Sequence, residues 1–140
     1  MHTIISFGHK FGKVPDAIKT FDVRFLQGPT KNLRKLNGTS AKLQKELFFD
    51  DDFSKYYEEI KLEIETLMKK FVNEDSNLIF AIGCEEGIHR SVAIVERLKN
   101  DLLIIDCEIE HRDLKRDKIL NQLYRQKYRD NKYRSFDTNW

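Results

Sequence analysis

The stretch NLIFAIGCEEGIHRSVAIVERLKN, residues 77–100, decides the fold because it joins a buried strand to a helix through a short loop. Residues 77–84 are an almost continuous apolar run, which is typical of a strand covered on both faces in a parallel sheet. Gly83 and Gly87 mark the loop, and residues 88–100 have a helical pattern. Ligands of such sheets bind at the carboxyl ends of the strands, so this loop is the first candidate for a site.

The flanking sequence continues the alternation of strands and helices. Short apolar or alternating segments predict three further strands, at 3–8, 19–26 and 102–111. Helices are expected over 50–72 and 113–130, and residues 27–42 are expected to form a long loop. The expected helix over 50–72 carries apolar side chains every three or four residues: Phe53, Tyr56, Ile60, Ile64, Leu67 and Phe71. These elements predict an α/β fold in which helices flank a mostly parallel sheet.

The bulk composition limits the classes of protein to consider. A chain of 140 residues predicts one domain, and 34% charged residues predict a water-soluble one. No apolar run approaches the roughly 20 residues of a membrane span, and the first residues lack the pattern of a secretory signal. The two cysteines are not in a zinc-binding pattern. We therefore expect a cytoplasmic protein with no metal, no cofactor and no membrane partner.

The loop after the buried strand has the spacing of a phosphate cradle. Cys84 is followed by five residues and then by Arg90 and Ser91. Backbone N–H groups at the start of a helix lack intrahelical acceptors and favour anions, and Arg90 can hold two phosphate oxygens at once. The candidate phosphate contacts are eight consecutive residues: Cys84, Glu85, Glu86, Gly87, Ile88, His89, Arg90 and Ser91.

The same loop permits two functions, which the spacing alone does not separate. It can hold a phosphate without chemistry, or it can present the Cys84 thiolate as the nucleophile of a cysteine-dependent phosphatase. A phosphatase also needs a general acid, for which the sequence offers Asp50–Asp52 upstream and Asp113 downstream. For Asp50–Asp52 we favour the alternative interpretation as a helix N-cap cluster, because aspartates are preferred at that position.

Four segments, in order, resemble one known family, the C-terminal domain of the RapZ RNase adapter proteins. They are SFGHKFG (6–12), FDVRFL (21–26), AIGCEEGIHRSVAIVERL (81–98) and EHRD (110–113), and the resemblance covers about residues 3–116. It implies an α/β domain that binds glucosamine 6-phosphate and small regulatory RNA, assembles into oligomers, and holds phosphate without hydrolysing it. The chain has no GxxxxGK[ST] motif, so it resembles a stand-alone version without the family's nucleotide-binding domain.

The resemblance also implies which residues contact the ligand. By motif position these are Lys10, Asp22, Arg24, Cys84, His89 and Arg90, with His111 and Arg112 as further contributors. The chain departs from the family pattern at Glu85-Glu86, where members have Thr-Gly, and at Gln27-Gly28. Thr30, kept as a candidate contact, stands where members often have His. The departures concern the sugar side of the site more than the phosphate side.

Several of these residues also have a purely structural interpretation. Asp22 and Arg24 either form a salt bridge at the end of their strand or face the anion. His111-Arg112 would form one cationic pocket with His89-Arg90 if the strands that end near 84 and 111 are neighbours.

The C-terminal part of the chain is strongly basic. Residues 112–134 contain nine Lys or Arg and three Asp, a local net charge of +6. Such a segment either forms a solvated amphipathic helix or contacts an anionic partner such as RNA. We expect residues 1–116 to form the RapZ C-terminal-like domain, and 117–140 to be a basic helix and tail of the same domain.

The sequence therefore predicts a non-enzymatic domain that binds a phosphorylated small molecule, of the phosphosugar kind, and also RNA through the basic segment. A cysteine phosphatase that uses Cys84, Arg90 and Asp113 is the alternative.

Overall fold

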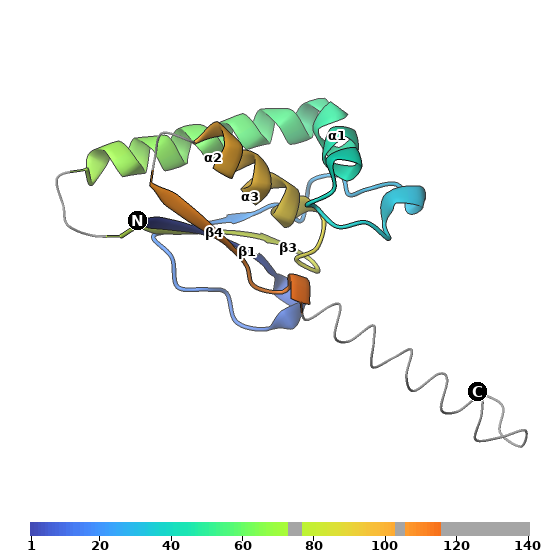
Figure 1. The fold of residues 1–140 in the computed structure, drawn as a ribbon, viewed down its shortest axis with the longest axis horizontal. Coiled ribbons are helices and arrows are strands. Elements are labelled where there is room, and N and C mark those ends of the chain that lie inside the picture. Colours follow the sequence, from blue (N-terminus) through green and yellow to red (C-terminus); the bar gives the residue numbers. More distant parts are fainter. Residues whose placement is uncertain (73–76, 103–105, 116–140) are drawn as a thin grey trace, which may run out of the picture.

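A computed structural model describes residues 1–72, 77–102 and 106–115 (Figure 1). The strands are β1 (His2–Gly8), β2 (Lys19–Asp22), β3 (Ile79–Cys84) and β4 (Cys107–His111). The helices are α1 (Ala41–Phe49), α2 (Asp51–Lys70) and α3 (Arg90–Asp101), with short 3₁₀ helices η1 (His9–Phe11) and η2 (Lys31–Leu33). The α/β fold class is confirmed.

The four described strands form one parallel sheet in the order β2-β3-β1-β4. All four carboxyl ends therefore lie at one edge, where Gly8 is paired with Cys84 and Asp22 with Gly83. β1 separates β3 from β4, so the strands that end near 84 and 111 are not neighbours. In Figure 1, α1, α2 and α3 lie on one side of this sheet, and the segment between η1 and β2 runs along the other.

The main core lies between the sheet and the three helices. Alternate residues of β3, Phe80 and Ile82, belong to it and have no exposed surface. On the other face Phe7 packs over Gly83, since a Cβ at Gly83 would lie 2.3 Å from the Phe7 ring. β3 is thus covered on both faces, as its apolar run predicted.

The helix over 50–72 is confirmed, but three of the six residues expected in its buried stripe are only partly buried. The fully buried side chains are Phe53, Tyr57, Ile60, Ile64 and Met68. Tyr56, Leu67 and Phe71 pack partly buried at the edge of the same core. Tyr57 is buried in place of Tyr56, and its hydroxyl donates to Asp101 at 2.5 Å, which satisfies the polar end of the buried ring.

Three elements differ from expectation. The strand expected over 102–111 begins at Cys107 among the described residues, and Leu102 is instead the C-cap of α3. The second strand ends at Asp22 rather than 26, because Leu26 N–H donates to the Val23 carbonyl in a turn. The helix α1 begins at Ala41, inside the segment expected to be loop, and has Ser40 as its N-cap.

Of the helix expected over 113–130, only residues 113–115 are described, and the rest lies outside the described residues. Among the described helices, none is long and apolar enough to cross a bilayer.

Candidate functional site

The candidate site begins where β3 ends and the chain curls toward α3. Gly87 has φ +74°, a conformation that favours glycine, and its N–H donates to Cys84 Sγ at 3.3 Å. The Ser91 hydroxyl lies 3.1 Å from the same sulfur. Cys84 is only 2% exposed, so the loop closes around its sulfur. The predicted strand–loop–helix unit is therefore present, with Cys84 at its base.

Arg90 is the first residue of α3 and ties the loop to the segment after β2. Its Nη1 donates to the carbonyls of Arg24 and Leu26 at 2.7 and 2.8 Å. The N–H groups of the first turn of α3 have no acceptor within the helix, and its first intrahelical bond runs from Ala93 N–H to the His89 carbonyl. The positive end of α3 and the Arg90 guanidinium therefore meet at one point.

His89 makes a second tie to the same segment. Its Nε2 lies 2.7 Å from the Arg34 carbonyl, which can only accept, so Nε2 carries the proton. Gly38 N–H donates to the Ile88 carbonyl at 2.7 Å, and a Cβ at Gly38 would lie 2.4 Å from Ala93 N. The segment between β2 and α1 is thus packed directly on the start of α3.

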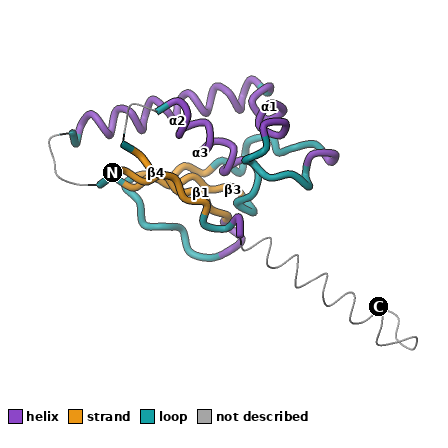
Figure 2. The backbone as a smooth tube through the Cα atoms, in the orientation of Figure 1, coloured by secondary structure: helices purple, strands orange, loops and turns teal. Residues whose placement is uncertain are grey.

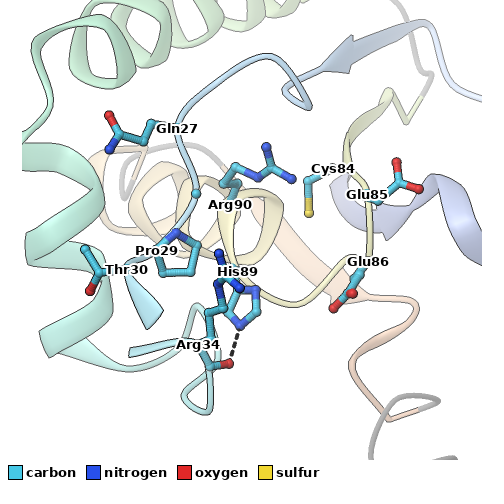
Figure 3. Close-up of a pocket in the computed structure, with 10 residues that line it drawn as sticks. Gln27, Pro29, Thr30, Arg34, Cys84, Glu85, Glu86, His89 and Arg90 are labelled. Atoms are coloured by element: carbon cyan, nitrogen blue, oxygen red, sulfur yellow. Dashed lines mark hydrogen bonds between the residues drawn. The ribbon is translucent and has the colours of Figure 1, made fainter. Parts of the chain in front are cut away.

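A pocket of about 540 Å³ lies between these two segments (Figure 3). Figure 2 shows both loops at the same end of the sheet. The lining residues are Gln27, Gly28, Pro29, Thr30, Arg34, Cys84, Glu85, Glu86, His89 and Arg90. In Figure 3 the Arg90 guanidinium points toward Cys84, whereas the Glu85 carboxylate points away from Arg90. The pocket floor therefore presents cationic and N–H donor groups.

Six of the predicted contacts line this pocket: Thr30, Cys84, Glu85, Glu86, His89 and Arg90. Sequence reasoning did not single out Gln27, Pro29 or Arg34 as contacts. The signals were the length of the loop over 27–42, since long loops in compact domains often carry function, and the departure from the family pattern at Gln27-Gly28. Thr30 is held in place by Glu46, to which its N–H and hydroxyl both donate, at 3.0 and 2.7 Å.

Asp22 and Arg24 form the salt bridge that the sequence offered as one interpretation. Arg24 Nη2 lies 2.7 Å from Asp22 Oδ2, and its Nε also donates to the carboxylate. These hydrogen bonds hold the pKa of Asp22 below its usual value. The Asp22 hydrogen bond, with a smaller contribution from the Glu85 charge, raises the pKa of Arg24. Neither residue lines the pocket.

Lys10 lies beside the loop rather than in the pocket. Its backbone N–H donates to the Glu85 carbonyl at 3.0 Å, and its ammonium lies 5.6 Å from the Phe11 ring centroid. Its contact with the Cys84–Arg90 loop is thus through the main chain.

His111, Arg112 and Asp113 also lie outside the pocket lining. His111 is held between the Ser6 hydroxyl, at 2.7 Å from Nδ1, and Glu96, at 3.0 Å from Nε2. Arg112 and Asp113 form an ion pair at 2.9 Å, and Asp113 has no exposed surface. Because β1 lies between β3 and β4, the single cationic pocket with His89 and Arg90 does not form.

The upstream aspartates are accounted for by the start of α2. Asp50 accepts from the Phe53 N–H at 3.1 Å as the N-cap, and Asp51 and Asp52 occupy the first turn. They line a second pocket of about 550 Å³ beside the first, with which it shares Gln27, Gly28 and Thr30. Within the described part of the chain, no cluster of His, Cys, Asp or Glu is arranged to hold a metal ion.

Comparison with known proteins shows which family this chain resembles in sequence. The model of the RapZ C-terminal domain family matches residues 1–115. A protein named nucleotide-binding protein from Synechococcus sp. (strain JA-2-3B'a(2-13)) is 44% identical over 102 residues, which are 71% of this chain and 31% of that protein. One of the same name from Carboxydothermus hydrogenoformans is 40% identical over 118 residues, which are 81% of this chain and 41% of that protein.

The chain thus spans less than half the length of these relatives, and the match reaches the end of the described residues. The curled Cys84–Arg90 loop and the sheet that carries it fall wholly within the matched region. The chain belongs to the RapZ C-terminal domain family.

Proposed function

We propose that this domain binds a phosphorylated small molecule of the phosphosugar kind in the pocket between the Cys84–Arg90 loop and residues 27–34, and releases it unchanged. The observation that carries the proposal is the convergence of the Arg90 guanidinium and the start of α3 on one pocket. Helix N-termini favour bound phosphate through their free N–H groups, and an arginine fork can hold two phosphate oxygens at once.

The hydrogen bonds of Arg90 determine which atoms would hold the anion. Nη1 is used by the carbonyls of Arg24 and Leu26. We therefore assign Nε and Nη2 to the phosphate, together with N–H groups of the first turn of α3. Arg34, on the opposite wall, adds a second guanidinium.

The remaining walls suit a ligand that is rich in hydroxyl groups. Gln27 and Thr30 offer an amide and a hydroxyl, and Glu85 and Glu86 offer exposed carboxylates at the rim. Carboxylates accept hydrogen bonds from hydroxyl or ammonium groups. A phosphosugar, with or without an amino group, therefore matches both halves of the pocket.

The printed names of the relatives are compatible with this ligand class. Those proteins are named for nucleotide binding, and a nucleotide also carries phosphate. Because this chain covers only 31% and 41% of the two proteins, the name applies to the whole of each relative and not to this domain in particular.

Isothermal calorimetry with glucosamine 6-phosphate, glucosamine, AMP and inorganic phosphate tests the proposal. We expect saturable binding of the phosphosugar and of inorganic phosphate, and none of unphosphorylated glucosamine. Tight binding of AMP with none of the phosphosugar would replace the ligand class by nucleotides. A chain that binds none of the phosphorylated compounds would refute the proposal.

One observation favours the alternative, a cysteine-dependent phosphatase. Ser91 Oγ lies 3.1 Å from Cys84 Sγ, where a hydroxyl can stabilise a thiolate leaving group. The proposed general acid, Asp113, is buried in its pair with Arg112 and is not among the residues that line the pocket. Turnover of an aryl phosphate near pH 6 that Cys84→Ser abolishes would establish the phosphatase; no turnover by the wild type would eliminate it.

RNA binding through residues 112–134 also remains a proposal. Its support is the local net charge of +6, and only 112–115 of this segment lie within the described residues. Gel shifts of the full chain and of a chain ending at 115, at two salt concentrations, test it. Loss of a salt-sensitive shift on truncation supports the proposal, and an unchanged shift contradicts it.

A further inference from the structure

The carboxyl end of β4 carries a buried ion pair that the proposed function leaves unused. Asp113 has no exposed surface, and both its carboxylate oxygens accept from Arg112, at 2.9 to 3.1 Å. A charge that is removed from water is normally retained only where it is paired and hydrogen-bonded. The position of this pair, beside the floor of the phosphate loop, indicates its role.

The pair holds both polar groups of one residue of β1, Gly8. The Gly8 N–H donates to Asp113 Oδ2 at 2.7 Å, and the Gly8 carbonyl accepts from Arg112 Nη2 at 3.3 Å. Arg112 is itself fixed on three sides. Its backbone N–H donates to the Ser6 carbonyl at 3.0 Å, its Nη1 donates to the Lys13 carbonyl, and its guanidinium lies 5.3 Å from the Phe7 ring centroid.

Gly8 in turn lies directly against the phosphate loop. A Cβ at Gly8 would lie 2.4 Å from the Glu86 carbonyl carbon and 2.7 Å from Gly87 N. A Cβ at Gly87 would lie 2.5 Å from Gly8 N. The two backbones therefore touch with no side chain between them, and a displacement of Gly8 must displace Gly87. Because Gly87 N–H donates to Cys84 Sγ, such a displacement reaches the base of the site.

We propose that Arg112 and Asp113 are positioning residues, which set the affinity of the Cys84–Arg90 loop for phosphate through Gly8 without touching the ligand. This inference rests on the proposed function of the loop. It replaces the expectation that Arg112 contacts the ligand and that Asp113 serves as a general acid. Preorganised donors bind an anion more tightly than donors that must first be ordered, so loosening the pair should weaken binding.

The test uses Asp113→Asn and Arg112→Lys in the full chain, with Glu96→Gln as the matched control. Asp113→Asn removes the carboxylate charge, and Arg112→Lys keeps the positive charge but loses the fork that holds two groups at once. Glu96→Gln removes the carboxylate that His111 Nε2 contacts, also at the end of β4, and the hydrogen bonds to Gly8 come from Arg112 and Asp113 instead. All three should lower the thermal midpoint.

The readout that separates positioning from stability is the Kd of inorganic phosphate, measured below the midpoint by NMR from the Gly87 amide resonance. We expect Asp113→Asn and Arg112→Lys to raise this Kd about tenfold, the lower end of the loss seen when a residue that orients a metal ligand is removed. Glu96→Gln should leave the Kd within about twofold of the wild type. Unchanged Kd values in both pair variants, or an equal rise in Glu96→Gln, would overturn the inference. If Asp113→Asn does not fold, Arg112→Lys decides alone.

The free proteins give a second readout, which distinguishes failure of this inference from failure of the proposed function. A wild-type chain that binds no phosphate refutes the function of the loop. The Gly87 amide shift in phosphate-free protein then still decides the positioning itself. A change in the pair variants and none in Glu96→Gln supports it, and the reverse pattern overturns it.

Discussion

Replacing Arg90 with alanine removes two kinds of contact at once. In the free protein, Arg90 Nη1 donates to the carbonyls of Arg24 and Leu26, which fastens the segment after β2 to the start of α3. In the proposed complex, Nε and Nη2 of the same side chain hold the phosphate. The variant should therefore lose both stability and affinity.

The two losses follow from the hydrogen bonds. Two bonds to carbonyls at about 1 kcal/mol each give a loss of about 2 kcal/mol in the free energy of unfolding. For a domain of this size that lowers the thermal midpoint by about 6–8 °C. Loss of a charge-assisted, two-point contact with phosphate costs about 1.5–3 kcal/mol, which raises the Kd about 10- to 100-fold.

Calorimetry with inorganic phosphate and thermal unfolding of the free protein measure these two effects separately. Arg90→Lys, which keeps the charge but loses the fork, should fall between the wild type and Arg90→Ala in both assays. The matched control is Arg97→Ala, on the same helix, whose guanidinium carbon lies 4.0 Å from the Phe48 ring centroid. It should cost about 0.5–1 kcal/mol of stability and leave the Kd within about twofold of the wild type.

The outcome that refutes this reasoning is an Arg90→Ala chain that still binds phosphate within about threefold of the wild type, since about 1.5 kcal/mol of affinity would then have another source. A Kd that rises equally in Arg97→Ala would show that the loss reflects net charge and not the geometry of Arg90.

Three further predictions follow from the same contacts. Cys84→Ser should keep the phosphate Kd within about threefold, because a hydroxyl can accept the same loop N–H; calorimetry showing a larger loss would contradict the assignment of the phosphate to Arg90 and the N–H groups of the loop rather than to the Cys84 sulfur. Gly38→Ala should cost about 1–3 kcal/mol by urea denaturation, because its Cβ would lie 2.4 Å from a backbone nitrogen of α3; an unchanged midpoint would contradict that contact. The Arg24 hydrogen bond lowers the pKa of Asp22, so their stabilising interaction is present above the unfolded pKa of about 3.9 and is lost as pH falls through the folded value. Asp22→Asn should therefore make the free energy of unfolding fall less steeply as the pH is lowered, by less than about 1 kcal/mol because the pair is half exposed. Urea denaturation at several acid pH values measures this difference, and an unchanged pH dependence in the variant would contradict the prediction.

The central unit was predictable because its signals are local. The apolar run of β3, the glycines of the loop and the pattern of α3 all lie within residues 77–100. The structure moves the bounds only slightly, to Ile79–Cys84 and Arg90–Asp101. A positive φ falls at Gly87, in the loop that the glycines marked.

The elements that were missed depend on distant neighbours. α1 has nine residues with only Leu43 and Leu47 buried, a pattern too short to predict a helix. Short helices gain most of their stability from tertiary packing, here against α2 and α3. The stripe on α2 shows the same limit, since Tyr56 and Tyr57 both fit helical spacing and only the position of Asp101 selects Tyr57.

The residues of the candidate site also differ in whether they belong to one local segment or are brought together by distant packing. His89 and Arg90 could be named from the sequence because they belong to the loop itself. On the opposite wall, family motif position pointed to Thr30 and to Gln27-Gly28, whereas Pro29 and Arg34 could not be named, because they reach the pocket only when the segment after β2 packs on α3.

The sequence by itself determined the α/β class and the strand–loop–helix unit over 77–100, because periodicity and glycine placement act over a few residues. Its four ordered motifs also identified the family. Only the tertiary structure decided the strand order β2-β3-β1-β4, because that order depends on which strands hydrogen-bond edge to edge across long stretches of sequence. That order places β1 between the loop and the end of β4. It thereby removes Arg112 and Asp113 from the pocket and puts them behind Gly8, where they hydrogen-bond both polar groups of its backbone.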